Sequence, residues 1–445
     1  MIITYWDWLL CPFYLIVIFT IASRIKNKYI KINPSYRFFI WGLFAKILGS
    51  IAVCITYVYY YKAGGDTISY HSSAVAYANL LLQSPSNFFS VFLGDTSNEN
   101  FSYFNLKTGY PIYWGDTQAT NVVKFNILLE LIAFNNYIVA SILMAIVSFI
   151  GVWKLYLMFC EIYPQLFVKF SIAILFMPSV VFWGSGMLKD SWTIAAAGMF
   201  TYSFYRIFIN KNSLFINVTM IIISSLILIS IKPYIFIALF PGSLIWGSWD
   251  KIVGIKNYIL KIIIVPLVFS LGIGIGFFVW TLVSPNLGDY SSLDSMILKA
   301  HVSYEDLKQD YYQGNSFDLG TYDPTLAGVM SKFPIATITG LFRPYIWESK
   351  NIVMIFSGIE NLLIMFFVIY VLVKKPMTAV INIISNPLVL FCLIFAIFFS
   401  FSVAISTSNF GALVRLRIPM IPFFISGFII INDFNKVQKY SRYFR

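Results

Sequence analysis

Residues 38–60 read FFIWGLFAKILGSIAVCITYVYY, an apolar run in which Lys46 is the one charged residue. A helix needs about 20 such residues to cross the hydrocarbon core of a bilayer, so this run predicts a transmembrane helix. The next stretch, GGDTISYH at 64–71, changes abruptly to glycines and polar side chains. We therefore expect the helix to leave the membrane there and to place Asp66 near the membrane surface.

Similar apolar runs recur along all 445 residues, and the composition fits lipid as the surrounding solvent. The chain is 59% hydrophobic and 11% charged, with a mean hydropathy of +0.78, whereas soluble domains carry about 25% charged residues. The fold class predicted is an all-α polytopic membrane protein, one transmembrane domain over 1–445 with about 11 transmembrane helices. The candidate spans are about 5–23, 38–60, 136–159, 166–183, 190–208, 213–231, 234–249, 258–284, 352–373, 387–405 and 418–432.

Basic residues orient the chain, because Lys and Arg concentrate on the cytoplasmic side of membrane proteins. With eleven spans, basic clusters after the odd-numbered spans all fall on one face, as do those of the C-terminal tail. The net charge of +12 comes from these short runs rather than from one basic domain, which argues against a nucleic-acid partner. The Ile-, Phe-, Asn- and Lys-rich composition is typical of a bacterial source, so we expect a multi-pass protein of a bacterial inner membrane, with the N-terminus outside and the C-terminus in the cytoplasm.

Two long segments then lie on the outer face. The first extracytoplasmic loop, 61–135, contains apolar runs such as AVAYANLLL and FNILLELIAF, which are typical of helices lying in the membrane interface. The second, 285–351, contains the polar stretch SYEDLKQDYYQGNSFDLGTYDP at 303–324, which we interpret as a mobile lid.

Two outer motifs combine glycine with ionisable residues. In GGDTISYH, Asp66 takes a proton from an acceptor hydroxyl, holds a metal or caps a helix, and His71 is a candidate substrate-binding residue. In WGSGMLKDSW at 183–192, Lys189 and Asp190 follow a Gly-x-Gly turn at an expected helix start, an arrangement that suits a phosphate. The alternative for the second motif is an ordinary turn, with Asp190 as a helix cap and Lys189 reaching toward the membrane surface.

Two further motifs bring charged residues to outer ends of spans. In LFRPYIWESKN at 341–351, Arg343 and Glu348 either bind substrate or form a structural ion pair. Glu360 lies inside the next apolar run and is expected to face the protein interior beside an arginine, because an unpaired buried carboxylate is costly. In SNFGALVRLRIP at 408–419, Arg415 and Arg417 are candidate phosphate ligands, of which only one is expected to face the site.

The long first outer loop with Gly65-Asp66 near its start resembles that of the GT-C superfamily of integral membrane glycosyltransferases. The segments Phe-Arg-Pro…Trp-Glu at 342–348 and Arg-x-Arg-x-Pro at 415–419 look like those of bacterial surface-polysaccharide membrane proteins. Many relatives have a paired acidic motif in this loop, whereas here Asp66 is followed by Thr67. The resemblance implies interfacial helices in the loop, a polyprenyl-phosphate-linked sugar donor and a glycan, lipid or protein acceptor.

The resemblance also implies roles for particular residues. Asp66 would be the general base, with Asp116 of Trp-Gly-Asp-Thr as a second candidate acid in the same loop. Lys189, Arg415 and Arg417 would bind the donor phosphate. Membrane lipids surround such an enzyme, and a divalent cation (Mg²⁺ or Mn²⁺) stays open as a cofactor, with metal ligands unknown.

Two other functions stay open. A surface-polysaccharide polymerase or ligase of the O-antigen type would use the same kind of donor and rely on arginines rather than on a carboxylate base. A lipid-linked sugar flippase would form no glycosidic bond and would need a polar path through the membrane. Lys46 and Glu360 are the ionisable residues that stand out inside the spans.

Overall fold

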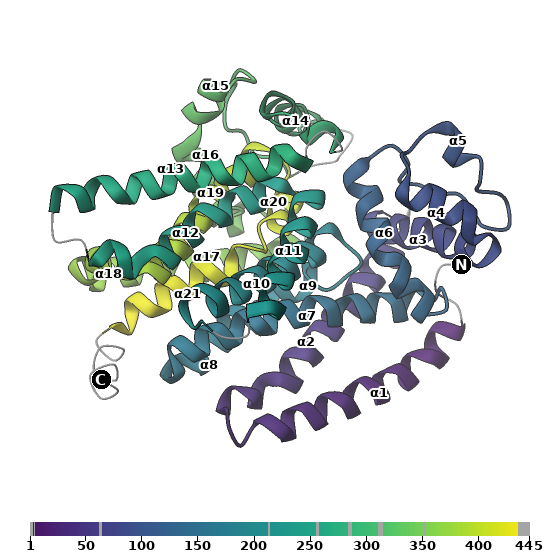
Figure 1. The fold of residues 1–445 in the computed structure, drawn as a ribbon, viewed down its shortest axis with the longest axis horizontal. Coiled ribbons are helices and arrows are strands. Elements are labelled where there is room, and N and C mark those ends of the chain that lie inside the picture. The colour runs from purple at the N-terminus through teal and green to yellow at the C-terminus, as the bar shows by residue number, and fades with distance from the viewer. Residues whose placement is uncertain are drawn as a thin grey trace. The chain divides into compact units, whose positions relative to one another are not determined.

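The computed structural model describes residue 3 and residues 5–61, 65–211, 214–254, 258–283, 287–309, 315–350 and 352–434. Gly64, Lys256 and the basic residues after 434, on which the sequence interpretation drew, lie outside these ranges. Every regular element within the described ranges is a helix (Figure 1). Within the same ranges, the one β-type pairing is an isolated antiparallel bridge between Ser316 and Asn409. The all-α prediction is therefore confirmed for the described part of the chain.

The helices pack into two compact units, a division that no change of composition along the sequence marks. Unit 1 consists of Met1–Leu157 and Val180–Gly198, and unit 2 consists of Met158–Ser179 and Met199–Arg445. Three helices contribute residues to both units: α7 (Tyr137–Ile162), α9 (Pro178–Trp183) and α10 (Lys189–Phe204).

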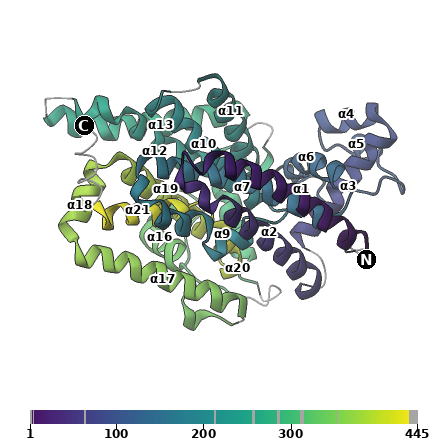
Figure 2. The same ribbon diagram turned by 90° about the horizontal axis from the view of Figure 1, so that it is seen from below.

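In unit 1, two N-terminal helices run side by side, and a helical layer is built from the first long loop (Figures 1 and 2). Within that layer α3 packs on α6 and on α4. Local sequence sets the helix starts: Pro85 occupies the first turn of α4, and Asp116 caps α6 by accepting a hydrogen bond from the Ala119 amide. The helices are α1 (Tyr5–Tyr29), α2 (Phe39–Ile55), α3 (Asp66–Gln83), α4 (Pro85–Leu93), α5 (Asn98–Phe101) and α6 (Thr117–Ile132).

Glycines allow backbones to approach closely in unit 1. A Cβ added at Gly151 of α7 would lie 2.1 Å from the carbonyl oxygen of Ala195 in α10. A Cβ at Gly49 of α2 would lie 2.2 Å from the carbonyl oxygen of Val181 in α9. Small residues at such contacts are a common device of helix packing in membranes.

In unit 2, helix α19 packs against α12, α16 and α21, and it lies among them in both views (Figures 1 and 2). Proline in the first turn starts α12, α16, α18 and α19, where its missing N–H costs nothing. The main helices are α11 (Leu214–Ile231), α12 (Pro233–Val253), α13 (Tyr258–Val283), α14 (Leu293–Asp306), α15 (Leu326–Ser331), α16 (Phe333–Phe342), α17 (Ile352–Lys374), α18 (Pro376–Ser385), α19 (Pro387–Ile405), α20 (Phe410–Leu416) and α21 (Ile421–Asn432), with the short α8 (Phe167–Phe170) before them.

Six helices of the described chain are long and apolar enough to cross a membrane, or seven if α20 and α21, bent by 67°, form one span. A multi-pass helical membrane protein is thereby supported, whereas the predicted eleven crossings are not confirmed. The run predicted as 166–183 is divided into α8, a π-helical turn over Ser171–Leu175 and α9. The run at 190–208 is a 16-residue α10 that ends in a π-helical turn, and α12 and α13 each contain an internal proline.

The first long loop, predicted to be extracytoplasmic, is helical over its apolar runs, as those runs indicated. AVAYANLLL lies within α3, and most of FNILLELIAF lies within α6. Their position in the interface stays a prediction. In the second loop, residues 310–314 of the expected lid lie outside the described residues, and the remainder is reported below.

Candidate functional site

One group of predicted site residues lies in unit 1, at the start of α3. Gly65 precedes this helix with φ +124°, and a Cβ there would lie 2.9 Å from the Tyr57 ring, so both the backbone and the space favour glycine. Asp66 is the first residue of α3 and is half-buried. The Tyr113 hydroxyl donates a hydrogen bond of 2.9 Å to Oδ1 of Asp66. The structure therefore holds this carboxylate in a defined orientation.

Tyr113, which sequence reasoning missed, is itself held from several sides. Its amide N–H lies 3.3 Å from Oγ of Ser73, its carbonyl accepts a 3.1 Å hydrogen bond from Thr120, and its ring lies 4.7 Å from that of Tyr70. Tyr113 stands three residues before Asp116, in an aromatic stretch of the loop. That aromatic stretch was the only sequence signal for Tyr113, because a tyrosine in a sequence gives no indication that it binds a distant carboxylate.

Asp116 serves as a helix cap and as an ion-pair partner. Oδ1 accepts a 2.9 Å hydrogen bond from the Ala119 amide, and Oδ2 lies 3.4 Å from Nζ of Lys189. The Asp116 side chain is 42% exposed, so this pair contributes little to stability. Asp116 and Lys189 lie in the same unit as Asp66. The segment that contains Tyr113 and Asp116 contacts Asp66 through the Tyr113 hydroxyl.

Lys189 reaches this position from the turn between α9 and α10. Gly186 lies against α2 and α3: a Cβ there would be 2.6 Å from Val53 and 3.7 Å from Thr67, the neighbour of Asp66. Ser191 closes the turn by donating a 2.6 Å hydrogen bond to the Gly186 carbonyl. Lys189 opens α10, as the motif predicted, whereas Asp190 is fully buried.

His71 pairs with a residue that sequence reasoning did not single out. Its Nδ1 lies 2.8 Å from Oε1 of Glu130 in α6, and the carboxyl group of Glu130 is fully buried. Burial raises the pKa of Glu130, and the neighbouring His71 partly offsets that rise. His71 also packs against the ring of Tyr137, whose hydroxyl is 2.7 Å from Oγ1 of Thr67. The pair therefore braces α3 against α6 behind Asp66, and a lone carboxyl in an apolar run was its only sequence signal.

The predicted arginines lie in unit 2. Nε of Arg343 donates to both carboxylate oxygens of Glu348, at 2.9 and 3.2 Å, and Nη2 bonds the same carboxylate. The structural ion pair that we considered for these residues is thus present. The guanidinium of Arg343 also lies over the rings of Phe317 and Phe410, at 5.4 and 5.0 Å from their centroids.

Arg417 is 1% exposed and is bonded to backbone at the end of α16. Nη1 donates to the carbonyl oxygens of Gly340, Leu341 and Arg343, at 3.2, 3.3 and 2.8 Å, and Nη2 bonds the Asn361 side chain. With these partners Arg417 holds the backbone of Arg343, so we assign it to positioning rather than to direct phosphate contact.

The neighbours of Arg417 follow the expected pattern. Arg415 is partly exposed whereas Arg417 is buried, so the two arginines of this motif differ in their surroundings, and a site at Arg415 stays a prediction. Glu360 is buried and accepts a 2.8 Å hydrogen bond from the Ser179 amide and another from the Ser179 hydroxyl. It also interacts electrostatically with Arg417, as an interior carboxylate beside an arginine would.

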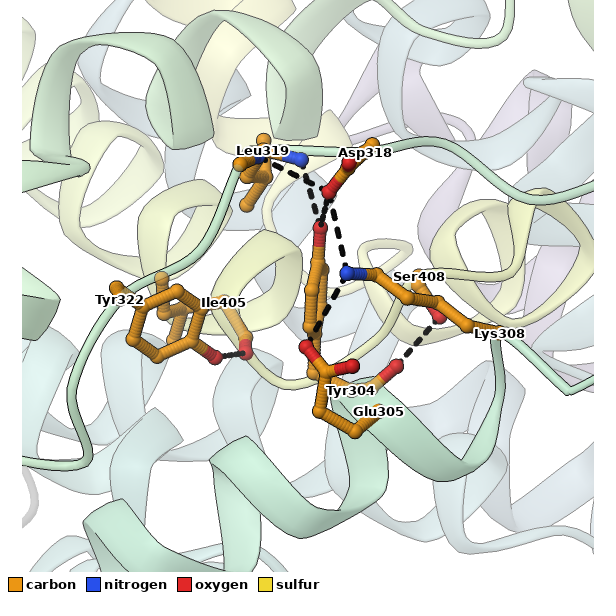
Figure 3. A network of polar contacts seen from close by, with 9 residues as sticks. Tyr304, Glu305, Lys308, Asp318, Leu319, Tyr322, Ile405 and Ser408 are labelled. Atoms are coloured by element: carbon orange, nitrogen blue, oxygen red, sulfur yellow. Dashed lines mark hydrogen bonds and ion pairs between the residues drawn. The ribbon is translucent and has the colours of Figure 1, made fainter.

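The described part of the predicted lid is fastened to the loop that precedes Arg415 (Figure 3). Oγ of Ser408 donates a 2.6 Å hydrogen bond to the carbonyl of Tyr304, and the Tyr322 hydroxyl donates to the carbonyl of Ile405 at 3.0 Å. Lys308 pairs with Glu305 and with Asp318, each at 3.1 Å. Of residues 304–322, the structure describes 304–309 and 315–322.

Chemically, unit 1 offers an oriented carboxylate, Asp66, and a lysine that pairs with Asp116, and unit 2 offers an arginine between two aromatic rings. Among the described residues, no three His, Cys, Asp or Glu side chains gather as a metal site would require. Comparison with protein-family models, curated protein sequences and solved structures finds no match to this chain.

Proposed function

We propose that this chain is a membrane glycosyltransferase. It would move a sugar from a polyprenyl-phosphate donor to an acceptor hydroxyl on the extracytoplasmic face, with Asp66 as general base. One observation carries the proposal: the Asp66 carboxylate opens α3, oriented by the Tyr113 hydroxyl, in the same unit as Lys189. A positioned base and a cation for the leaving group are the two functions that this reaction requires.

In an inverting transfer, the Asp66 carboxylate accepts the proton of the acceptor hydroxyl. The acceptor oxygen bonds to the anomeric carbon while the bond from that carbon to the phosphate oxygen breaks. The electron pair of that bond leaves with the polyprenyl phosphate, whose negative charge Lys189 would stabilise. General-base catalysis contributes about 10²–10⁴ in rate, so loss of the base should reduce transfer to near background.

The test compares Asp66→Asn with the wild-type protein in proteoliposomes. A panel of polyprenyl-phosphate hexoses serves as donor, and release of polyprenyl phosphate is measured together with bond formation. Asp95→Asn is the matched control, because Asp95 lies in the same outer loop and bonds only local residues, Ser97 and Asn100. Asp66→Asn should be inactive and Asp95→Asn active. Wild-type turnover by Asp66→Asn would remove Asp66 from the mechanism.

The second candidate is a surface-polysaccharide polymerase or ligase, and the Arg343 cluster favours it. An arginine flanked by Phe317 and Phe410 offers both a phosphate ligand and apolar faces against which a sugar ring can pack. Inactive arginine variants (Arg343→Gln, Arg415→Gln) together with an active Asp66→Asn variant would select this function. Movement of labelled lipid across the bilayer without bond formation would instead select the flippase.

A further inference from the structure

Lys46 is a buried lysine in a membrane span that the proposed reaction does not use. It lies in α2, and the residue is 1% exposed. Nζ lies 2.7 Å from the carbonyl oxygen of Gly184, 3.0 Å from that of Val180 and 3.2 Å from Oγ of Ser148. Three acceptors match the three N–H donors of a lysine ammonium group. Within the described chain, no carboxylate lies at ion-pair distance from Lys46.

Two of these three partners lie at the end of α9: Val180 belongs to the helix, and Gly184 directly follows it. A cation at the carbonyl end of a helix complements the helix dipole. Lys46 therefore caps α9 from a neighbouring span. Ser148 of α7 strengthens the arrangement by donating a 2.5 Å hydrogen bond to the same Gly184 carbonyl.

The capped carbonyl also begins the turn that leads to Lys189. From Gly184 the chain passes Gly186, which is fixed against Val53 of α2, and reaches Lys189 at the start of α10. Helix α2 thus contacts this turn twice, through Lys46 at Gly184 and through Val53 at Gly186. A shift of its first residue would be passed on to Lys189, because the intervening backbone is short and tightly packed.

We propose that Lys46 is a positioning residue, which fixes the Gly184–Lys189 turn and thereby places the Lys189 ammonium beside Asp116. The proposal rests on the proposed function for its catalytic consequence, but its geometric content stands without it. The alternative is that Lys46 only satisfies its own hydrogen bonds, with no effect on Lys189.

Lys46→Met is a suitable test, because each affected carbonyl keeps another partner. The Val180 carbonyl still accepts from the Gly184 amide at 3.2 Å, and the Gly184 carbonyl still accepts from Ser148. Lys154→Met is the matched control: it is the same substitution in α7, another span with residues in unit 1. If Lys46→Met fails to accumulate, Ser148→Ala removes one bond to the Gly184 carbonyl and keeps the lysine.

The first measurement needs no substrate. Cysteines are introduced at 116 and 189, and the rate at which a short polar bis-thiol reagent links them is followed in membranes. The four native cysteines are buried, so the reagent reports the introduced pair. Lys46→Met should slow linking by about tenfold, because the net loss of one or two hydrogen bonds to a buried segment shifts its equilibrium by about that factor. Lys154→Met should leave the rate unchanged. An unchanged rate in both Lys46→Met and Ser148→Ala overturns the inference.

The second measurement is transfer by the otherwise native chain. A misplacement of about 1 Å can cost about 10²-fold in rate, so Lys46→Met should lower kcat/KM for a polyprenyl-phosphate hexose by about 10-fold to 100-fold. Combined with Lys189→Met, it should cause little further loss, and multiplication of the two losses would contradict action through Lys189. Slower linking in a protein without transfer activity would support the positioning role while refuting the glycosyltransferase.

Discussion

Replacing Tyr113 by phenylalanine removes one hydroxyl group and little else. The ring should keep its place, because the amide and carbonyl of Tyr113 are bonded to Ser73 and Thr120, and Tyr70 packs against the ring. The lost contact is the 2.9 Å hydrogen bond to Asp66. A hydrogen bond to a charged group contributes about 1.5–3 kcal/mol, and because both residues are half-buried we take the lower end.

About 1.4 kcal/mol corresponds to a tenfold change in rate, so kcat should fall about tenfold. KM for the donor should stay unchanged, since the hydroxyl acts on the base and not on the donor phosphate. The assay is release of polyprenyl phosphate in proteoliposomes under saturating donor, followed by a titration of donor concentration.

Tyr110→Phe is the matched control. Tyr110 lies in the same loop, its ring packs on Phe101, and the residue is 48% exposed. It should turn over like the wild type. If Tyr113→Phe also matches the wild type while Asp66→Asn is inactive, the hydroxyl does not orient the base, and the reasoning from this hydrogen bond is refuted.

Three further predictions concern stability, measured as the midpoint of thermal unfolding in detergent. Gly151→Ala should abolish folding or severely destabilise the protein, because its Cβ would overlap a backbone carbonyl. At Gly274 an added Cβ has nothing within 4 Å, so Gly274→Ala should be neutral or stabilise the protein by about 0.5–1 kcal/mol. Equal midpoints for the two variants would contradict the packing at Gly151. Arg417→Met should lower stability by about 3 kcal/mol or more, since three carbonyl oxygens lose a buried donor, and a wild-type midpoint would refute its positioning role. The pKa of Asp318 is lowered by its bonds to Lys308 and the Gly320 amide, so its contribution is present above the unfolded pKa of about 3.9 and is lost as pH falls through the folded value. Because this side chain is exposed, the contribution should be under about 1 kcal/mol; Asp318→Asn should remove that part of the acid sensitivity, and an identical pH profile would contradict it.

Much of the fold was predictable, because long apolar runs specify membrane helices with little help from the rest of the chain. Residues 38–60 and 387–405 were predicted as spans, and both correspond to helices that pass the criteria for crossing a membrane. Residues 166–183 were also predicted as one span, but the helix stops at 176–177, before Pro178, a break that an average of hydropathy over the run does not register. Division into two units depends on packing between distant segments, which a single sequence does not display.

The site was predictable where chemistry is local. The helix start at Asp66 and the pair of Arg343 with Glu348 both depend on residues within five positions of one another. Contacts between distant positions were not predictable. Tyr113 meets Asp66 across 47 positions, and the partners of Lys46 lie more than 100 positions away. Only the fold brings such groups together. The sequence can indicate that a residue such as Lys46 is unusual in its apolar run, but it does not indicate the partners of that residue.

The bend between α20 and α21 has a consequence for topology, because the parity of the crossings decides whether the two termini share a face. Eleven crossings and seven are both odd, so either number places the termini on opposite sides of the membrane. Six crossings, with the bent pair entering and leaving on one side, would place them together. Nearly every residue of α21 is buried, so protein rather than lipid surrounds this short helix. We expect the pair to cross, in agreement with the distribution of basic residues, and a protease-accessible tag at each end of the chain reads that parity directly.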